Sequence, residues 1–116
     1  MSDNSSHNPR PDVLGGFEHQ VLLAVARLDG QTYSVPIVLE LQERTGREVA
    51  AASVFVTLRR LERKGYLSSS LADPEPGQVG RPRRLFRLLP EGIEAMREAG
   101  EVLRRLSEGV SLGDLA

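Results

Sequence analysis

The sequence contains no cysteine, which excludes disulfide frameworks, thiolate metal sites and cysteine nucleophiles. It also lacks tryptophan and has only 4% aromatic residues, so its core must consist mostly of leucine, valine, isoleucine and alanine. No apolar run reaches about 18 residues, and the polar start lacks the apolar segment of a signal peptide. We therefore expect a cytoplasmic protein without a membrane span and without a cofactor.

Residues suited to catalysis are also scarce. There are only two histidines: His7 lies in the polar start, and His19 lies away from the apolar stripe of its predicted helix. A histidine in such a place is typical of a surface or an interface. The sequence has no phosphate-binding glycine loop, no paired metal ligands and no nucleophile motif. It therefore predicts neither an enzyme nor a metal site.

The length of 116 residues is enough for one small domain. We expect a disordered tail at 1–12, a domain at 13–89, a long helix at 90–110 and a short tail at 111–116. A core of this size is often completed by a partner subunit.

Apolar residues at helical spacing predict three helices in the domain. The first spans 14–28 and ends at an Asp-Gly turn. The second begins at Ser34, which we expect to be its N-cap, and ends at Gly46. The third spans 51–64 and stops at Gly65.

Two strand-like segments follow at 66–71 and 84–89. The loop between them is rich in proline, glycine and arginine. Three helices, a strand, a basic loop and a second strand, in that order, indicate a winged helix-turn-helix. The expected fold class is therefore α+β, mostly α, with an added C-terminal helix for dimerisation.

The net charge of −1 hides an uneven distribution along the chain. Residues 1–46 carry −3, residues 47–87 carry +5 and residues 88–116 carry −3. The positive charge thus coincides with the third helix and the hairpin, as binding to a phosphate backbone requires.

The outer face of the third helix is small and uncharged at its start and basic at its end. This division suits a helix that contacts base edges with its first turns and phosphates with its last turns. Ser53 and Val56 are the expected base contacts, and Thr57 is a weaker candidate because it lies nearer the buried side. The candidate DNA-binding residues of this helix are Ala52, Ser53, Val56, Thr57, Arg59, Arg60 and Arg63. The alternative is an ordinary solvated surface helix.

Three arginines gather at the far end of the hairpin loop: Arg81, Arg83 and Arg84. A narrow minor groove attracts arginines because of its negative potential, so we expect these residues to form a DNA-binding wing. The alternative is a flexible loop whose charge is incidental.

The fourth helix is expected at 90–106 and carries a line of apolar residues at alternating spacings of three and four. These residues are Met96, Ala99, Leu103, Leu106 and Val110. Such a heptad line with a charged remaining face is typical of a helix that pairs with a second helix. We therefore expect a dimer interface here. The alternative is a helix that folds back onto its own subunit.

Four separated blocks resemble the PadR family of bacterial transcriptional regulators in its short form with a single C-terminal helix. They are LGGFEHQVLLAVARL at 14–28, TYSVPIVLELQERTGREV at 32–49, SVFVTLRRLERKGYLSS at 53–69 and GRPRRLFRLLPEGIEAM at 80–96. The resemblance implies a homodimer that binds a pseudo-palindromic operator in double-stranded DNA, usually as a repressor. In the family, the helix matching 51–64 reads the major groove, the hairpin is the wing, and the last helix contacts the partner.

Some members of that family release DNA on binding a small aromatic or drug-like compound near the dimer interface. This chain lacks the aromatic residue that the family often has near Ser107. It also has Tyr33-Ser34 where the family often has Tyr-Gly, and Phe55 where a tyrosine is common. A small-molecule effector is therefore the least expected of the implied partners.

A winged helix can also serve as a module that binds protein, because fold does not fix function. The positive band between residues 47 and 87 argues against this alternative, since the centres of protein-binding faces are usually depleted in charge. The dependence of binding on salt separates the two readings.

Overall fold

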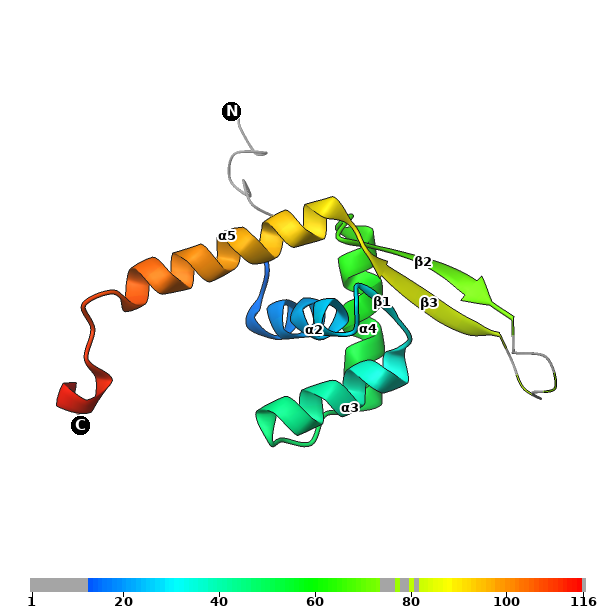
Figure 1. Cartoon of the computed structure of the whole chain (residues 1–116), viewed down its shortest axis with the longest axis horizontal. Helices are drawn as coiled ribbons and strands as arrows, with labels where there is room; N and C mark the ends of the chain where they lie inside the picture. The colour runs from blue at the N-terminus through cyan, green and yellow to red at the C-terminus, as the bar shows by residue number, and fades with distance from the viewer. Residues whose placement is uncertain (1–12, 74–76, 78–79, 81, 116) are drawn as a thin grey trace, which may run out of the picture.

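The computed structural model describes residues 13–73, 77, 80 and 82–115. The predicted tail at 1–12, with His7, and the predicted wing residue Arg81 lie outside the described residues. The elements, in chain order, are α2 (Gly16–Arg27), β1 (Gln31–Thr32), α3 (Ser34–Thr45), α4 (Ala51–Arg63), β2 (Leu67–Ala72), β3 (Arg83–Leu88), α5 (Pro90–Ser107) and the 3₁₀ helix η1 (Leu112–Leu115). Helices dominate, and the predicted order of three helices, a hairpin and a last helix is confirmed (Figure 1).

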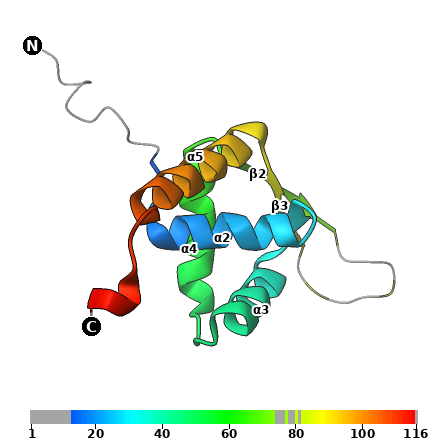
Figure 2. The ribbon, with the colours of Figure 1, turned by 60° about the vertical axis from the view of Figure 1, so that its left-hand side comes forward.

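The core lies where α2, α3 and α4 meet the base of the hairpin. Its members are almost all aliphatic, as the composition predicted, and the largest fully buried side chain is Phe86 of β3. Figure 2 shows α2 crossing in front of α4, with α3 beside them. The fully buried side chains are Phe86, Leu22, Ile37, Leu58, Leu61, Leu67, Val21, Val25 and Val54.

The ends of the helices follow local backbone chemistry. Gly46 closes α3 with φ 71°, and Gly65 follows α4 with φ 84°, a left-handed conformation that glycine adopts without strain. The start of α3 differs from the prediction. Tyr33 is its N-cap residue and Ser34 is already its first helical residue, so the serine does not cap the helix with its side chain.

The sheet contains one strand that the sequence analysis missed. The strand order is β1-β3-β2, and both pairings are antiparallel. Strand β1 has only two residues, Gln31 and Thr32, which pair with Arg87 and Phe86 of β3. A segment this short has no periodicity of its own, and its conformation depends on the neighbouring strand.

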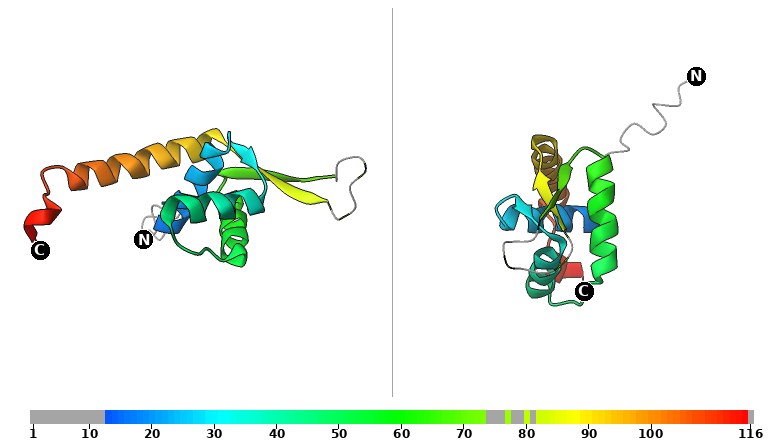
Figure 3. Two further views of the ribbon diagram at one scale, coloured as in Figure 1. Left: turned by 60° about the horizontal axis from the view of Figure 1, so that its bottom comes forward. Right: turned by 90° about the vertical axis from the view of Figure 1, so that its right-hand side faces the viewer.

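The β2–β3 hairpin leaves the helical body as a long arm, and α5 extends in the opposite direction (Figures 1 and 3). The pairing of the hairpin runs from Leu67–Leu88 at its base to Ala72–Arg83 at its outer end. The predicted wing is therefore an ordered two-stranded arm up to Arg83.

The first half of α5 packs against its own subunit. Gly92 is buried there, and a Cβ atom at this position would lie 2.5 Å from the carbonyl oxygen of Tyr66. Glycine is thus required for the close approach of α5 to the start of the hairpin. Ala95 and Met96 also pack against the core. Met96 therefore lies at the end of α5 that contacts its own core.

A partly buried ion pair joins the start of α2 to the end of α4. The Lys64 ammonium donates hydrogen bonds to both carboxylate oxygens of Glu18, at 2.8 and 3.0 Å, and to the carbonyl oxygen of Val13 at 3.2 Å. The same carboxylate accepts a hydrogen bond from the backbone N–H of Gly15 at 2.8 Å. Burial alone would raise the pKa of Glu18. The hydrogen bonds from Lys64 and Gly15 and the positive charges of Lys64 and Arg60 lower it by more, so the pKa of Glu18 lies below its ordinary value of 4.5.

We predict that Lys64→Met lowers the free energy of unfolding at pH 7 by about 2 kcal/mol, because it leaves the Glu18 carboxylate without its charged partner. A carboxyl group with a depressed pKa stabilises the fold above its unfolded pKa, and this contribution is lost as the pH falls through the folded pKa. The difference between the two proteins should therefore shrink below about pH 4. Urea denaturation at one fixed protein concentration measures this difference at each pH.

The control is Arg97→Met, which removes a surface cation that pairs with Glu94 while both side chains stay exposed. It should change stability little at any pH. A Lys64→Met protein as stable as the wild type at pH 7 would contradict a structural role for the pair.

Candidate nucleic-acid interface

One face of α4 fills the core and the opposite face is exposed. Val54, Leu58 and Leu61 are fully buried. On the outer face, Ala52 and Ser53 are exposed, and Val56 keeps 51% of its surface accessible. The start of this face therefore offers small side chains and one valine to a partner, as the sequence predicted.

Thr57 does not belong to this outer face. Only 4% of its surface is accessible. We therefore remove Thr57 from the candidate base contacts. The helical periodicity of the sequence already places Thr57 nearer the buried side.

The basic end of α4 carries three arginines in different surroundings. Arg60 and Arg63 are exposed. Arg59 is half-buried, and its guanidinium forms an ion pair with Glu62, one turn further along the helix, at 3.2 Å. Arg60 also contributes to the low pKa of Glu18, so its positive charge reaches the α2 end of this face.

Two of the three predicted wing arginines are described, and each contacts another side chain. The Arg84 Nη1 group donates a hydrogen bond of 2.9 Å to the hydroxyl of Ser69 in β2. The Arg83 guanidinium lies 3.9 Å above the centre of the Tyr33 ring. Both arginines therefore have side-chain partners at the outer end of the β2–β3 pairing, while a guanidinium keeps further N–H groups for other acceptors.

An aromatic contact fixes the hairpin against α4. The rings of Phe55 and Phe86 meet edge to face, with their centres 6.3 Å apart. Phe55 is part of α4 and Phe86 is part of β3, so this contact joins the helix to the strand that carries Arg83 and Arg84. The helix and the strand are therefore in direct contact at this point.

Among the described residues, little covers the second half of α5. Every described residue from Glu101 to Leu115 is exposed, including Leu103 at 58% and Leu106 at 71%. Ion pairs between side chains three or four residues apart, such as Arg104 with Glu101 at 2.6 Å, support this helical segment. The sequence left open whether this helix pairs with a second helix or folds back onto its own subunit. The start of α5 folds onto its own subunit, whereas its second half extends away from it.

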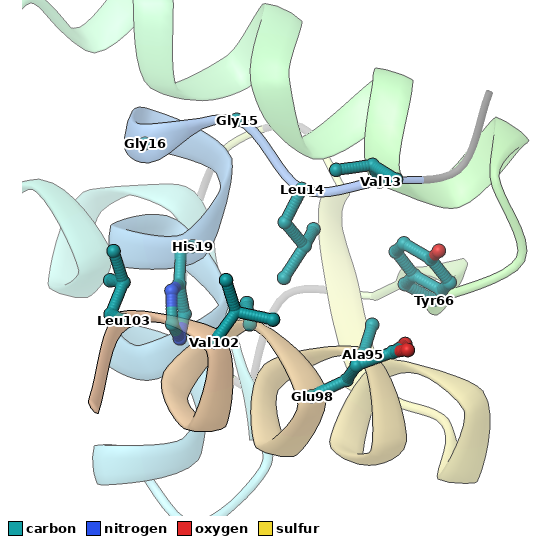
Figure 4. Close-up of a pocket in the computed structure, with 11 residues that line it drawn as sticks. Val13, Leu14, Gly15, Gly16, His19, Tyr66, Ala95, Glu98, Val102 and Leu103 are labelled. Atoms are coloured by element: carbon teal, nitrogen blue, oxygen red, sulfur yellow. The ribbon is translucent and has the colours of Figure 1, made fainter. Parts of the chain in front are cut away.

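A groove of about 280 Å³ lies between the start of α2 and the middle of α5 (Figure 4). His19 lies in it beside Val102 and Leu103, and burial lowers the pKa of His19 below its ordinary value. Ala99 also lines this groove. The predicted seam residues Ala99 and Leu103 therefore border this groove.

Among the described residues, no group of histidine, aspartate and glutamate side chains has the arrangement of a metal site. Within the same part of the chain, no helix combines the length and apolar character needed to cross a membrane.

Three packed helices followed by a projecting two-stranded hairpin define a winged-helix protein. Residues 22–98 match the model of the transcriptional regulator PadR-like family. The chain belongs to this family, which consists of regulators and not of enzymes. The resemblance stated from the four sequence blocks is thereby confirmed.

Solved structures agree with this assignment. A PadR family transcriptional regulator from Eggerthella lenta is 27% identical, with a TM-score of 0.65 over 82% of this chain and 79% of the other. A PadR-like transcription factor from Bacteroides fragilis is 20% identical, with a TM-score of 0.70 over 98% of this chain and all of the other, and shares the fold. F93 from STIV, a winged-helix DNA-binding protein, is 11% identical, with a TM-score of 0.64 over 80% of this chain and 92% of the other, and also shares the fold. No curated protein matches the chain.

Sequence reasoning missed three residues that border the candidate interface: Tyr33, Glu62 and Ser69. The spacing of three between Arg59 and Glu62 could have indicated their ion pair. No local sequence pattern predicts the contact of Tyr33 with Arg83 or that of Ser69 with Arg84, because each contact joins segments that are distant in sequence.

Proposed function

We propose that the protein is a homodimeric regulator that binds a pseudo-palindromic operator in double-stranded DNA, acts in the cytoplasm and represses transcription. The outer face of α4 enters the major groove, where Ser53 and Val56 contact base edges and Ala52 allows a close approach. Arg59, Arg60 and Arg63 contact phosphates, and Arg83 and Arg84 place the wing on the DNA. Arg81, which lies outside the described residues, completes the wing in this proposal.

The exposed face of α4 is the observation that carries this proposal. Its opposite face is fully buried, so the outer face is rigidly held and serves no purpose in the core. The face changes from small side chains to exposed arginines along its length. The chain belongs to a family of transcriptional regulators, and this membership supports DNA as the partner of the exposed face.

The exposed end of α5 supports the homodimer. Val102, Leu103 and Leu106 are exposed along the second half of α5, and Val110 continues the line. An apolar line of this kind is stabilised when a second helix covers it. A second copy of α5 would cover these residues and would hold the two α4 helices about 34 Å apart, one turn of DNA.

The groove beside His19 is the candidate site for a small-molecule effector. It adjoins Ala99 and Leu103 of the proposed dimer seam, so a ligand there would alter how the two subunits pack. The family resemblance supports this place, and the apolar lining favours an apolar compound.

A salt titration of binding to the intergenic DNA beside the gene tests the proposed function. Fluorescence anisotropy with a labelled duplex should show binding that weakens steeply as salt rises, with a preference over an unrelated duplex of equal length. The competing candidate, a module that binds protein, would show no preferred duplex and no binding even at low salt.

A further inference from the structure

The described hairpin carries a chain of polar contacts that joins α4 to the wing. The Arg59 Nη1 group lies 3.2 Å from Glu62 Oε1. The hydroxyl of Ser69 donates a hydrogen bond of 2.6 Å to Glu62 Oε2, and it accepts one of 2.9 Å from Arg84 Nη1. The Glu62 carboxylate therefore holds one arginine of the helix directly and one arginine of the wing through Ser69.

A second contact reaches the wing from α3. Tyr33 caps the start of α3, and its ring lies under the Arg83 guanidinium at 3.9 Å. Within this distance a guanidinium is attracted to the face of an aromatic ring. Tyr33 is half-buried while Arg83 is exposed, so the ring is the fixed member of the pair.

These two contacts lie on opposite faces of the same strand. Successive side chains of a β-strand point to opposite faces, so Arg83 and Arg84 leave β3 in opposite directions. Arg84 lies on the face of Phe86, toward α4, and Arg83 lies on the face toward Tyr33. They also form the last two pairs before the loop, with Ala72 and Leu71 of β2. The wing is thus held on both faces at its outer end.

We propose that Glu62 and Tyr33 are positioning residues for DNA binding, which fix the direction of the wing by holding Arg84 and Arg83 before DNA arrives. This inference rests on the proposed function. An arginine side chain loses considerable rotamer freedom when it is immobilised on a partner, and an arginine that is already held loses less. The direction of the wing relative to α4 is then set in the free protein.

Removal of the Glu62 charge tests the proposal, because the two possible roles of Glu62 predict opposite changes in DNA affinity. It is a carboxylate between two arginines that are proposed to contact phosphate, with 29% of its side chain exposed. If it served only as a charge near DNA, its removal would strengthen binding, because repulsion from phosphate would be lost. If it positions the arginines, its removal weakens binding to the operator.

We expect Glu62→Gln to weaken operator binding about fivefold to tenfold, since the neutral amide loses the ion pair with Arg59 and cannot accept from Arg59 and from Ser69 on separate oxygens. Ser69→Ala removes the link to Arg84 without any change of charge and should weaken binding in the same direction. The matched control is Glu48→Gln, an exposed carboxylate just before α4, which should leave binding unchanged or strengthen it. Anisotropy on the preferred duplex measures affinity, and thermal unfolding verifies that each variant is folded.

A double-mutant cycle tests Tyr33. Tyr33→Phe keeps the ring and should preserve affinity, whereas Tyr33→Leu should weaken it about threefold. In an Arg83→Gln background, Tyr33→Leu should have no further effect, because the side chain that Tyr33 holds is gone. A merely structural role of Tyr33 would leave its effect unchanged in that background.

The possible failures are distinguishable. Wild-type protein that ignores duplex DNA contradicts the proposed function and this inference with it. A second outcome is that the wild-type protein binds the duplex while Glu62→Gln binds it more tightly and Ser69→Ala binds it with unchanged affinity. That result contradicts the role of Glu62 and leaves the proposed function intact. Additive effects of Tyr33→Leu and Arg83→Gln contradict the role of Tyr33.

Discussion

Leu103→Glu is expected to yield monomers that bind the operator poorly. Leu103 is 58% exposed in the single chain and lies in the middle of the proposed seam. Loss of one buried leucine costs roughly 1.5–3 kcal/mol, and a twofold dimer contains the change twice. The carboxylate also resists burial in an apolar seam. The dissociation constant of the dimer should therefore rise at least about a hundredfold, as measured by sedimentation equilibrium.

The control for this substitution is Arg105→Glu, which introduces the same carboxylate on the charged side of α5. Arg105 lies two residues after Leu103, about 200° away around the helix. This variant should remain a dimer with nearly wild-type operator affinity. An intact dimer of Leu103→Glu at micromolar concentration would show that the seam lies elsewhere.

Replacement of both Arg60 and Arg63 by alanine is expected to have the largest effect on DNA affinity. Both side chains are exposed at the basic end of α4. A homodimer would lose four phosphate contacts, which lowers the slope of log affinity against log salt by about 3.6. Affinity at moderate salt should fall about a hundredfold or more, while the preference among duplexes changes little, because phosphate contacts carry no sequence information.

The matched control removes two arginines from another surface. Arg27 and Arg44 both contact the Glu40 carboxylate, at 2.8 and 3.1 Å, between α2 and α3. Their replacement by alanine changes the net charge equally but should leave the salt slope nearly unchanged. Equal losses of affinity in the two double variants would indicate a general effect of charge and would contradict the assignment of the α4 face.

The helices were predictable because local signals agreed with the core. The spacing of Val54, Leu58 and Leu61 predicted the buried face of α4, and all three are fully buried. Gly65 marked its end, so the predicted range 51–64 differs from Ala51–Arg63 by a single residue. The same spacing also placed Thr57 near the buried side, where it lies.

The contacts around the wing were not predictable because they join distant parts of the chain. Strand β1 exists only through its pairing with β3, more than fifty residues later. Tyr33 contacts Arg83 from a similarly distant part of the chain, and the sequence predicts Ser34 in place of Tyr33 as the N-cap of α3. The heptad line in α5 did not show that its two ends have different surroundings. Met96 packs against the core of its own subunit, whereas Leu103 and Leu106 are exposed.

The most direct test is sedimentation velocity of the purified protein, alone and with a duplex from the intergenic region beside its gene. The account predicts a dimer at micromolar concentration, and two protomers on each duplex in dilute salt that dissociate as salt rises. A protein that sediments as a monomer in both samples, and leaves the duplex unbound in dilute salt, would contradict it.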